Sequence, residues 1–143
     1  MKTRIAVSAW LATFALAGCA GHMHNLAQED SDRDLTVGRF QHEGPEGASM
    51  VLEWRGARFE ARGFAIERNQ NLAKLQRRYG TDRRHWDRIS SGMDTDHYVY
   101  SAEPILRAGN GATLRCHAAW QAMAIPQGHC VTDEGTYINF RFE

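Results

Sequence analysis

The chain has 143 residues, with 17 basic and 17 acidic side chains and therefore no net charge at neutral pH when histidine is neutral. A dedicated nucleic-acid-binding domain is usually basic, so this balance gives that class no support. Outside the N-terminal segment, no apolar run is long enough to cross a bilayer.

The first residues follow the order of a secretory signal. Lys2 and Arg4 supply positive charge, an apolar run covers residues 5–17, and small residues precede Cys19. The stretch Leu16-Ala17-Gly18-Cys19 resembles the lipobox of bacterial lipoproteins. The resemblance implies a diacylglyceryl thioether on Cys19, cleavage immediately before it, and acylation of the new amino terminus.

Two alternatives remain open at this terminus. Ala15-Leu16-Ala17 could be the cleavage site of an ordinary secretory signal, and the apolar run could be a membrane anchor, although it is short for a span. A lipoprotein with several acyl chains would be held firmly, because each buried methylene adds about 0.8 kcal/mol. Ala20, rather than Asp, follows Cys19, which in the enteric sorting rule implies the outer membrane with the domain facing the periplasm.

These features divide the chain into three parts. We expect residues 1–18 to be the lipoprotein signal peptide, residues 19–34 a lipidated flexible tether, and residues 35–143 a single domain. The tether prediction rests on composition, because residues 20–34 are polar, acidic and poor in large apolar side chains. The remaining chain is long enough to bury one modest hydrophobic core.

The first elements of the domain should be strands. One is expected over residues 35–40, and a hairpin should follow it. Residues 49–54 and 57–66 alternate apolar and polar side chains with a period of two, which is typical of strands with one buried face. Arg55-Gly56 lies between them as a short turn, where glycine can adopt positive φ.

A helix is expected over residues 67–79. Leu72, Leu75 and Tyr79 fall on one face at helical spacing. Gly80 follows at the position where a left-handed residue ends many helices.

The rest of the domain should be mostly strands. After a short helix over residues 83–89, strands are expected at 97–102 and 113–120, and a hairpin of 128–132 with 136–142 ends the chain. We therefore predict an α+β domain with a largely antiparallel sheet, one main helix and a C-terminal hairpin tied by a disulfide.

The cysteines bear on the cellular compartment. If Cys19 carries lipid, Cys116 and Cys130 remain as a pair, and such pairs in exported proteins normally form disulfides. A bridge that closes a loop of about 15 residues is worth about 3 kcal/mol in the chain-entropy model. Two free thiols or a metal-binding pair are the alternatives, although the spacing is not that of a Cys-x-x-Cys motif.

The C-terminal segment carries a second, loose resemblance. It runs from Leu114-x-Cys116 through Gly128-x-Cys130 to Gly135-x-Tyr137-x2-Phe140 and covers about 30 residues. This segment is similar to the ends of uncharacterised exported envelope proteins. The resemblance implies a small exported β-module and indicates no activity.

Histidines are the candidates for metal binding. His22 and His24 flank Met23, and two imidazoles with a thioether could share a soft metal ion, although an ordinary polar tether explains the same residues. His117 and His129 each neighbour a paired cysteine, and they should lie close together on the solvent face if their strands pair. Two ligands are too few for a zinc site, which needs three or four.

Basic side chains concentrate in residues 74–88. The planar guanidinium of arginine suits phosphate and carboxylate groups, so this cluster could contact lipid headgroups, lipopolysaccharide or an anionic glycan. A solvated helix face balanced by nearby carboxylates is the alternative. The candidate residues for contact with an anionic surface are Lys74, Arg77, Arg78, Arg83, Arg84 and Arg88.

No motif names a reaction. The chain has neither a Gly-x-Ser-x-Gly elbow nor a glycine-rich phosphate loop, so no catalytic residue, metal site or cofactor is predicted. We expect a non-enzymatic, lipid-anchored protein of the bacterial envelope with a structural or interaction role, which contacts another envelope protein or an anionic glycan or lipid. The alternatives are an inhibitor or ligand-binding lipoprotein similar to small lysozyme inhibitors, and a metal-binding or hydrolytic protein.

Overall fold

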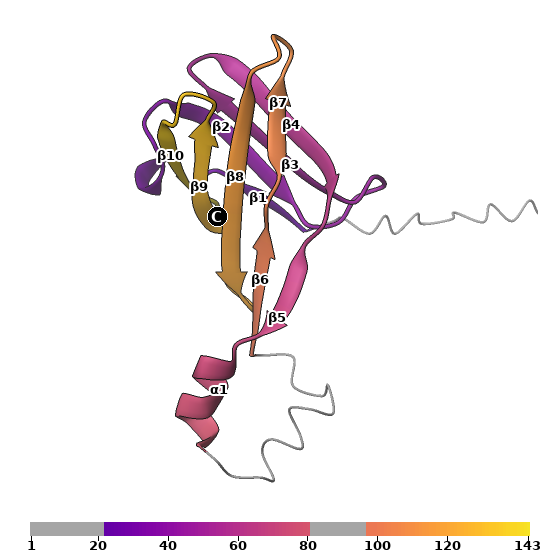
Figure 1. Ribbon diagram of the computed structural model, residues 1–143, viewed down its shortest axis with the longest axis vertical. Coiled ribbons are helices and arrows are strands. Elements are labelled where there is room, and N and C mark those ends of the chain that lie inside the picture. Colours follow the sequence, from indigo (N-terminus) through magenta and orange to yellow (C-terminus); the bar gives the residue numbers. More distant parts are fainter. Residues whose placement is uncertain (1–21, 81–96) are drawn as a thin grey trace, which may run out of the picture.

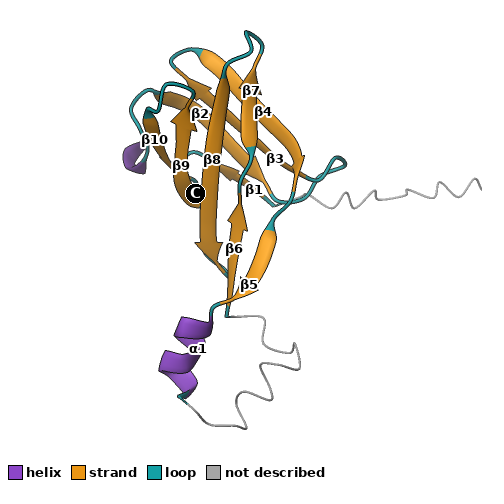
Figure 2. Cartoon of the chain, viewed as in Figure 1, coloured by secondary structure: helices purple, strands orange, loops and turns teal. Residues whose placement is uncertain are grey.

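The computed structural model describes residues 22–80 and 97–143, which form one antiparallel sheet of ten strands with two short helical segments. The strands are β1 (Met23–Asn25), β2 (Leu35–Gln41), β3 (Ala48–Trp54), β4 (Ala57–Phe64), β5 (Glu67–Gln70), β6 (Tyr98–Ala102), β7 (Ile105–Ala108), β8 (Thr113–Gln121), β9 (Gln127–Thr132) and β10 (Tyr137–Arg141). The helical segments are η1 (Gln28–Asp30) and α1 (Leu72–Tyr79). The sheet curls like a half-barrel, and β5, β6 and α1 extend from it as a narrow arm (Figures 1 and 2).

β8 is the central strand of the sheet, because it pairs with three other strands. Residues 113–115 of β8 pair with β7, residues 118–121 pair with β6, and residues 114–119 pair with β9. Because the pairing with β9 overlaps both of the others, β6 and β7 share one edge of β8 and β9 occupies the other edge. From β7 the order continues through β4, β3 and β2 to β1.

Backbone hydrogen bonds join the two far ends of the curled sheet. The Asn25 N–H donates to the Glu143 carbonyl (3.2 Å), and the Glu143 N–H donates to the Asn25 carbonyl (2.8 Å). Leu26 forms an antiparallel bridge with Phe142 directly beyond this pair. The end of β10 therefore lies against the segment that follows β1, and the hydrophobic core is enclosed between them.

The core is filled by alternate side chains of the strands. In β3, Met50 and Leu52 are fully buried, whereas Val51 between them faces outward. This period of two gives the sheet an apolar inner face and a polar outer face. The large, fully buried apolar side chains are Phe40, Phe142, Leu35, Met50, Leu52, Leu106, Leu114 and Ile138.

Both expected hairpins are present. β3 and β4 meet at Arg55-Gly56, whose φ angles of 49° and 76° are the positive values that a two-residue type I′ turn requires. β9 pairs with β10 at the C-terminus, as predicted. The predicted disulfide between Cys116 and Cys130 is also present, and it joins directly opposed residues of β8 and β9.

The α+β prediction is wrong, because the expected main helix over residues 67–79 is not formed. Glu67–Gln70 form β5, which pairs with β6, and α1 covers only the eight residues Leu72–Tyr79. All side chains of β5 are exposed, so this strand has no apolar alternation and is held by backbone pairing. α1 begins after Asn71, whose side chain accepts a hydrogen bond from the Lys74 N–H (3.1 Å), and lies at the tip of the arm rather than on the sheet (Figure 1).

The expected tether also differs from the structure from residue 22 onward. Residues 22–34 include β1 and η1, and Leu26 belongs to the core with 7% of its surface exposed. The pairing of β1 with β2 and its bonds to Glu143 order this polar segment. The short helix expected over residues 83–89 lies outside the described residues. In the described parts of the chain, no helix has the length and apolar character needed to span a membrane.

Removal of the disulfide should destabilise the domain. The double variant Cys116→Ser/Cys130→Ser is expected to lose about 2–4 kcal/mol of unfolding free energy, because the cross-link no longer restricts the unfolded chain. Urea denaturation followed by tryptophan fluorescence in oxidising buffer measures the difference. Wild-type protein treated with a reductant is the control and should approach the variant. Equal stability of both proteins in oxidising buffer would contradict the prediction.

Candidate functional site

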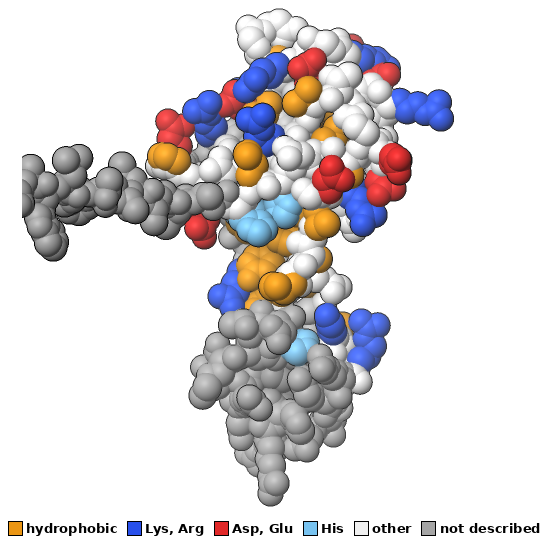
Figure 3. Space-filling view, turned by 180° about the vertical axis from the view of Figure 1, so that it is seen from behind, with side chains coloured by type: hydrophobic (Ala, Val, Ile, Leu, Met, Phe, Trp, Pro, Cys, Tyr) orange, Lys and Arg blue, Asp and Glu red, His pale blue; other side chains and the backbone are white. Residues whose placement is uncertain are grey.

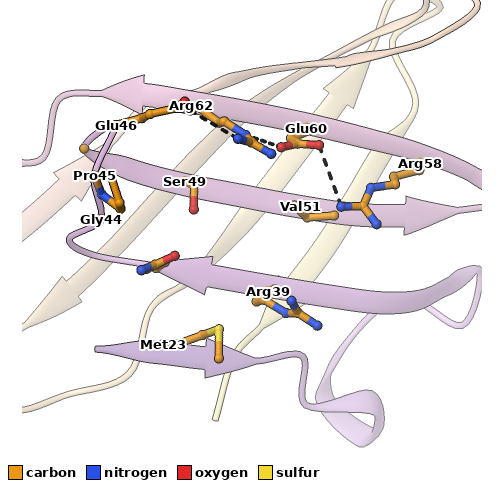
Figure 4. Close-up of a pocket in the computed structure, with 12 residues that line it drawn as sticks. Met23, Arg39, Gly44, Pro45, Glu46, Ser49, Val51, Arg58, Glu60 and Arg62 are labelled. Carbon is orange, nitrogen blue, oxygen red and sulfur yellow. Dashed lines mark hydrogen bonds and ion pairs between the residues drawn. The ribbon is translucent and has the colours of Figure 1, made fainter. Parts of the chain in front are cut away.

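A pocket of about 330 Å³ lies on the outer face of β1–β4 (Figure 4). Its floor is β3, where the short side chains of Ser49 and Val51 leave a hollow between the longer side chains of β2 and β4. The strand register places Val51 between Arg39 on one side and Glu60 on the other. The hollow is therefore a consequence of register, with small residues on the middle strand and long ones on both neighbours.

The loop between β2 and β3 closes one end of the pocket. The Gly47 N–H donates to the Gly44 carbonyl (3.0 Å), which folds the loop into a turn. Glu46 of this loop forms an ion pair of 3.1 Å with Arg62 of β4, and this contact ties the loop to the sheet. On the β1 side, the rim of the pocket is the half-exposed side chain of Met23.

Positive charge in the pocket is only partly compensated. Hydrogen bonds from Arg62 to Glu60 and then to Glu46 raise the pKa of the Arg62 guanidinium above its usual value. Glu60 is shared with Arg58, whose Nη2 lies 3.7 Å from the Glu60 Oε2. Arg39 forms no ion pair or hydrogen bond through its side chain within residues 22–80 and 97–143. The pocket thus presents an unpaired guanidinium, which suits a phosphate or carboxylate group.

Three histidines gather at one end of β1 and β2: His24 on β1, His22 directly before β1 and His42 directly after β2. The ring centroid of His24 lies 5.0 Å from that of His22 and 5.0 Å from that of His42. The ring centroids of His22 and His42 are 5.8 Å apart. Figure 3 shows histidine side chains gathered beside hydrophobic ones where the body narrows toward the arm. Met23 lines the outer pocket instead, so it does not share a site with the histidines on either side of it. No group of His, Cys, Asp and Glu side chains in the described part of the chain is arranged to hold a metal ion.

His42 is packed among aromatic rings. Its ring centroid lies 5.1 Å from that of Phe40 and 5.2 Å from that of Trp120, and its Nε2 is buried with no hydrogen-bond partner among the described residues. Burial, and then repulsion from His24 and His22, lowers the pKa of His42 to about 4. His42 is therefore neutral at pH 7. Burial also lowers the pKa of His24, although a hydrogen bond with the backbone of Glu143 opposes the shift.

The expected arginine-rich contact surface is only partly described. Lys74 and Arg77 lie on α1, and the Lys74 ammonium donates a hydrogen bond of 3.4 Å to Gln121 of β8. Arg78 is also in α1, but its side chain is outside the described parts of the structure. The remaining members, Arg83, Arg84 and Arg88, lie outside the described residues. Contact of this cluster with an anionic surface stays a prediction.

The prediction that His117 and His129 lie together on the solvent face is confirmed. They are directly opposed in β8 and β9, and their ring centroids are 6.0 Å apart. The Tyr137 ring lies beyond them, 5.5 Å from that of His129. These residues are on the outer face of the strands whose inner face carries the disulfide.

Sequence reasoning missed both the pocket and the third histidine. Arg39 and Arg58 are brought to one hollow by the register of three strands, and His42 reaches His22 only because β1 pairs with β2. The alternation of residues 22–25 was the signal that could have revealed β1, but their polar composition concealed it.

No protein-family model, curated protein or solved structure matches this chain. Its function is therefore inferred from the N-terminal motif, the fold and the chemistry of the pocket.

The histidine cluster should make the domain less stable in mild acid. Because the pKa of His42 falls from 6.5 to about 4 on folding, the unfolded chain takes up a proton between these values that the folded chain does not. Stability from this group is complete above pH 6.5, is lost as the pH falls toward about 4, and changes no further below that value. Between pH 7 and pH 5 the loss should be up to about 2 kcal/mol, and urea unfolding at these two pH values in chelator-treated buffer measures it.

Matched histidine substitutions test the origin of this pH dependence. His42→Phe keeps an aromatic ring against Phe40 and Trp120, and it should remove much of the difference between pH 7 and pH 5. His117→Asn, on the outer face of β8, should retain the difference. An unchanged pH dependence in His42→Phe would show that this residue does not control the acid sensitivity.

Proposed function

We propose that this protein is lipid-anchored in the bacterial envelope and that its domain has an interaction role, rather than a catalytic one, at the membrane surface. The observation that carries the proposal is the short connection between Cys19 of the lipobox-like motif and Met23, the first residue of β1. Four residues of extended chain span at most about 14 Å. An anchor on Cys19 would therefore hold β1 close to the bilayer.

The anchored end would be part of the sheet rather than a long spacer. β1 pairs with β2 and is bonded to Glu143 through Asn25, so its position relative to the pocket is set by backbone hydrogen bonds. The pocket rim at Met23 would then face the zone next to the membrane. A component that approaches the domain along the membrane surface would meet this face first.

The disulfide favours an exported location. Cys116 and Cys130 are bridged, and structural disulfides persist in oxidising compartments such as the periplasm but are rare in the cytosol. Ala20 follows Cys19, so the proposal extends to the outer membrane, with the domain facing the periplasm.

Cys19→Ser should release the protein from the membrane. Several acyl chains bury many methylenes at about 0.8 kcal/mol each, so wild-type protein is expected in the detergent phase of a phase-separation experiment and the variant in the aqueous phase. Intact-mass measurement should show added acyl groups on the wild type alone. Cys116→Ser/Cys130→Ser keeps Cys19 and should stay in the detergent phase. Recovery of wild-type protein from the aqueous phase with an unmodified Cys19 thiol would overturn the anchor.

Cross-linking in intact cells tests the interaction role. A photo-reactive residue at Met23 is expected to capture an envelope component, because this position lies at the pocket rim. The same residue at the exposed position Tyr137, on β10, is the control and should capture much less. Capture of a lysozyme at either position would favour the inhibitor alternative, and equal capture of the same components at both positions would contradict a specific role for the rim.

A further inference from the structure

The pocket over β1–β4 has the geometry of an anion-binding site. Arg39 on β2 and Arg58 on β4 lie on opposite sides of β3, and Val51 lies on the floor between them (Figure 4). A guanidinium group is planar and can donate two parallel N–H bonds to one oxyanion. Two such groups on either side of one hollow can therefore bind an anion from both sides.

The ion pairs already in the pocket leave these two guanidinium groups with unused donors. Arg62 hydrogen-bonds both carboxylates of the pocket, those of Glu60 and Glu46. The 3.7 Å separation between Arg58 and Glu60 is longer than a hydrogen bond, and Arg39 has no acidic partner within the described part of the chain. An anion could therefore bind Arg39 and Arg58 without disrupting the contacts that hold the loop between β2 and β3.

The size and lining of the pocket restrict its ligand. A volume of about 330 Å³ is at the small end of the range for ligand pockets, which suits a single headgroup rather than an extended chain. Val51 and Met23 supply apolar contacts beside the arginines, and Ser49 supplies a hydroxyl at the floor. Seen from behind the view of Figure 1, the body carries Lys and Arg side chains close together, with hydrophobic side chains and a few Asp and Glu side chains among them (Figure 3).

We propose that this pocket binds a phosphate-bearing group. If Cys19 is acylated, the rim at Met23 lies four residues from the membrane anchor, and headgroup phosphates are the nearest anions. The claim that the phosphate belongs to a membrane lipid rests on the proposed function. The claim that the pocket binds phosphate rests on its arginines alone. A soluble phosphate compound is the other source of the same group.

The test uses the chain from residue 19 with Cys19→Ser, which contains every described element and cannot be acylated. Sedimentation with phosphatidylcholine vesicles, with and without phosphatidylglycerol, measures binding to headgroups. Titration with inorganic phosphate, followed through the backbone amide signals of Ser49 and Val51, measures binding of the free anion. Circular dichroism establishes that each variant is folded.

Substitutions that remove one charge identify the site. Arg39→Gln and Arg58→Gln should each weaken binding about fivefold, the loss expected for one basic residue at an anionic surface. Arg115→Gln removes an exposed arginine on the outer face of β8 and should bind like the parent protein.

The outcomes distinguish two questions: whether the pocket binds phosphate, and whether that phosphate belongs to a lipid headgroup. Binding to phosphatidylglycerol vesicles that is weakened by Arg39→Gln and retained by Arg115→Gln supports the headgroup source. Phosphate-induced shifts at Val51 without vesicle binding support the site and overturn the headgroup source. No response to either probe, or equal weakening in all three variants, overturns the proposal. Because Cys19→Ser removes the acyl acceptor, these results do not depend on the outcome of the phase-separation experiment.

Discussion

The pairing of β1 on two sides is the interaction on which the rest of the structure depends. β1 pairs with β2 along Met23–Asn25, and Asn25 exchanges backbone hydrogen bonds with Glu143 beyond the end of β10. A strand of three residues thereby joins both ends of the curled sheet and holds Leu26 in the core. Backbone donors and acceptors are the same for every residue except proline, so a polar segment can make this connection. The ordered conformation of residues 23–26 comes from these bonds rather than from their own composition.

The alternation of side chains in β1 and β2 places the histidine cluster and the arginine-lined pocket on opposite faces of these strands. His24 lies on the inner side of β1 beside His42, whereas Met23 and Arg39 line the outer pocket. Burial lowers the pKa of His42, so this ring is neutral at pH 7, whereas the Arg39 side chain is exposed to solvent. Arg39 lies on β2 and His42 directly follows it, and β2 pairs with β1, the strand nearest the lipobox-like motif. An anchor at Cys19 would therefore place the charged pocket and the neutral histidine cluster at the same end of the sheet.

Elements with a local signal were predicted correctly, and those that depend on distant partners were not. Arg55-Gly56 forms the expected turn because two adjacent residues with positive φ suffice to specify it. The helix over residues 67–79 was wrong because the apolar spacing that supports it begins only at Leu72. Glu67–Gln70 has no such spacing, and its strand conformation depends on β6, which lies much later in the chain. The sheet was therefore predictable in outline, but its short strands β1, β5 and β7 were not.

The amino-acid sequence by itself determined the features that depend on residue identity or on near neighbours. These are the cysteine pair that forms the disulfide, the two hairpins, and the motif at Cys19 on which the proposed anchor rests. Only the tertiary structure decided that Arg39, Val51 and Glu60 would share a pocket. They are neighbours because β2, β3 and β4 pair in one register, and a shift of one residue would turn these side chains toward the core. That register is selected by burial across the whole sheet, so no short segment of the chain contains it.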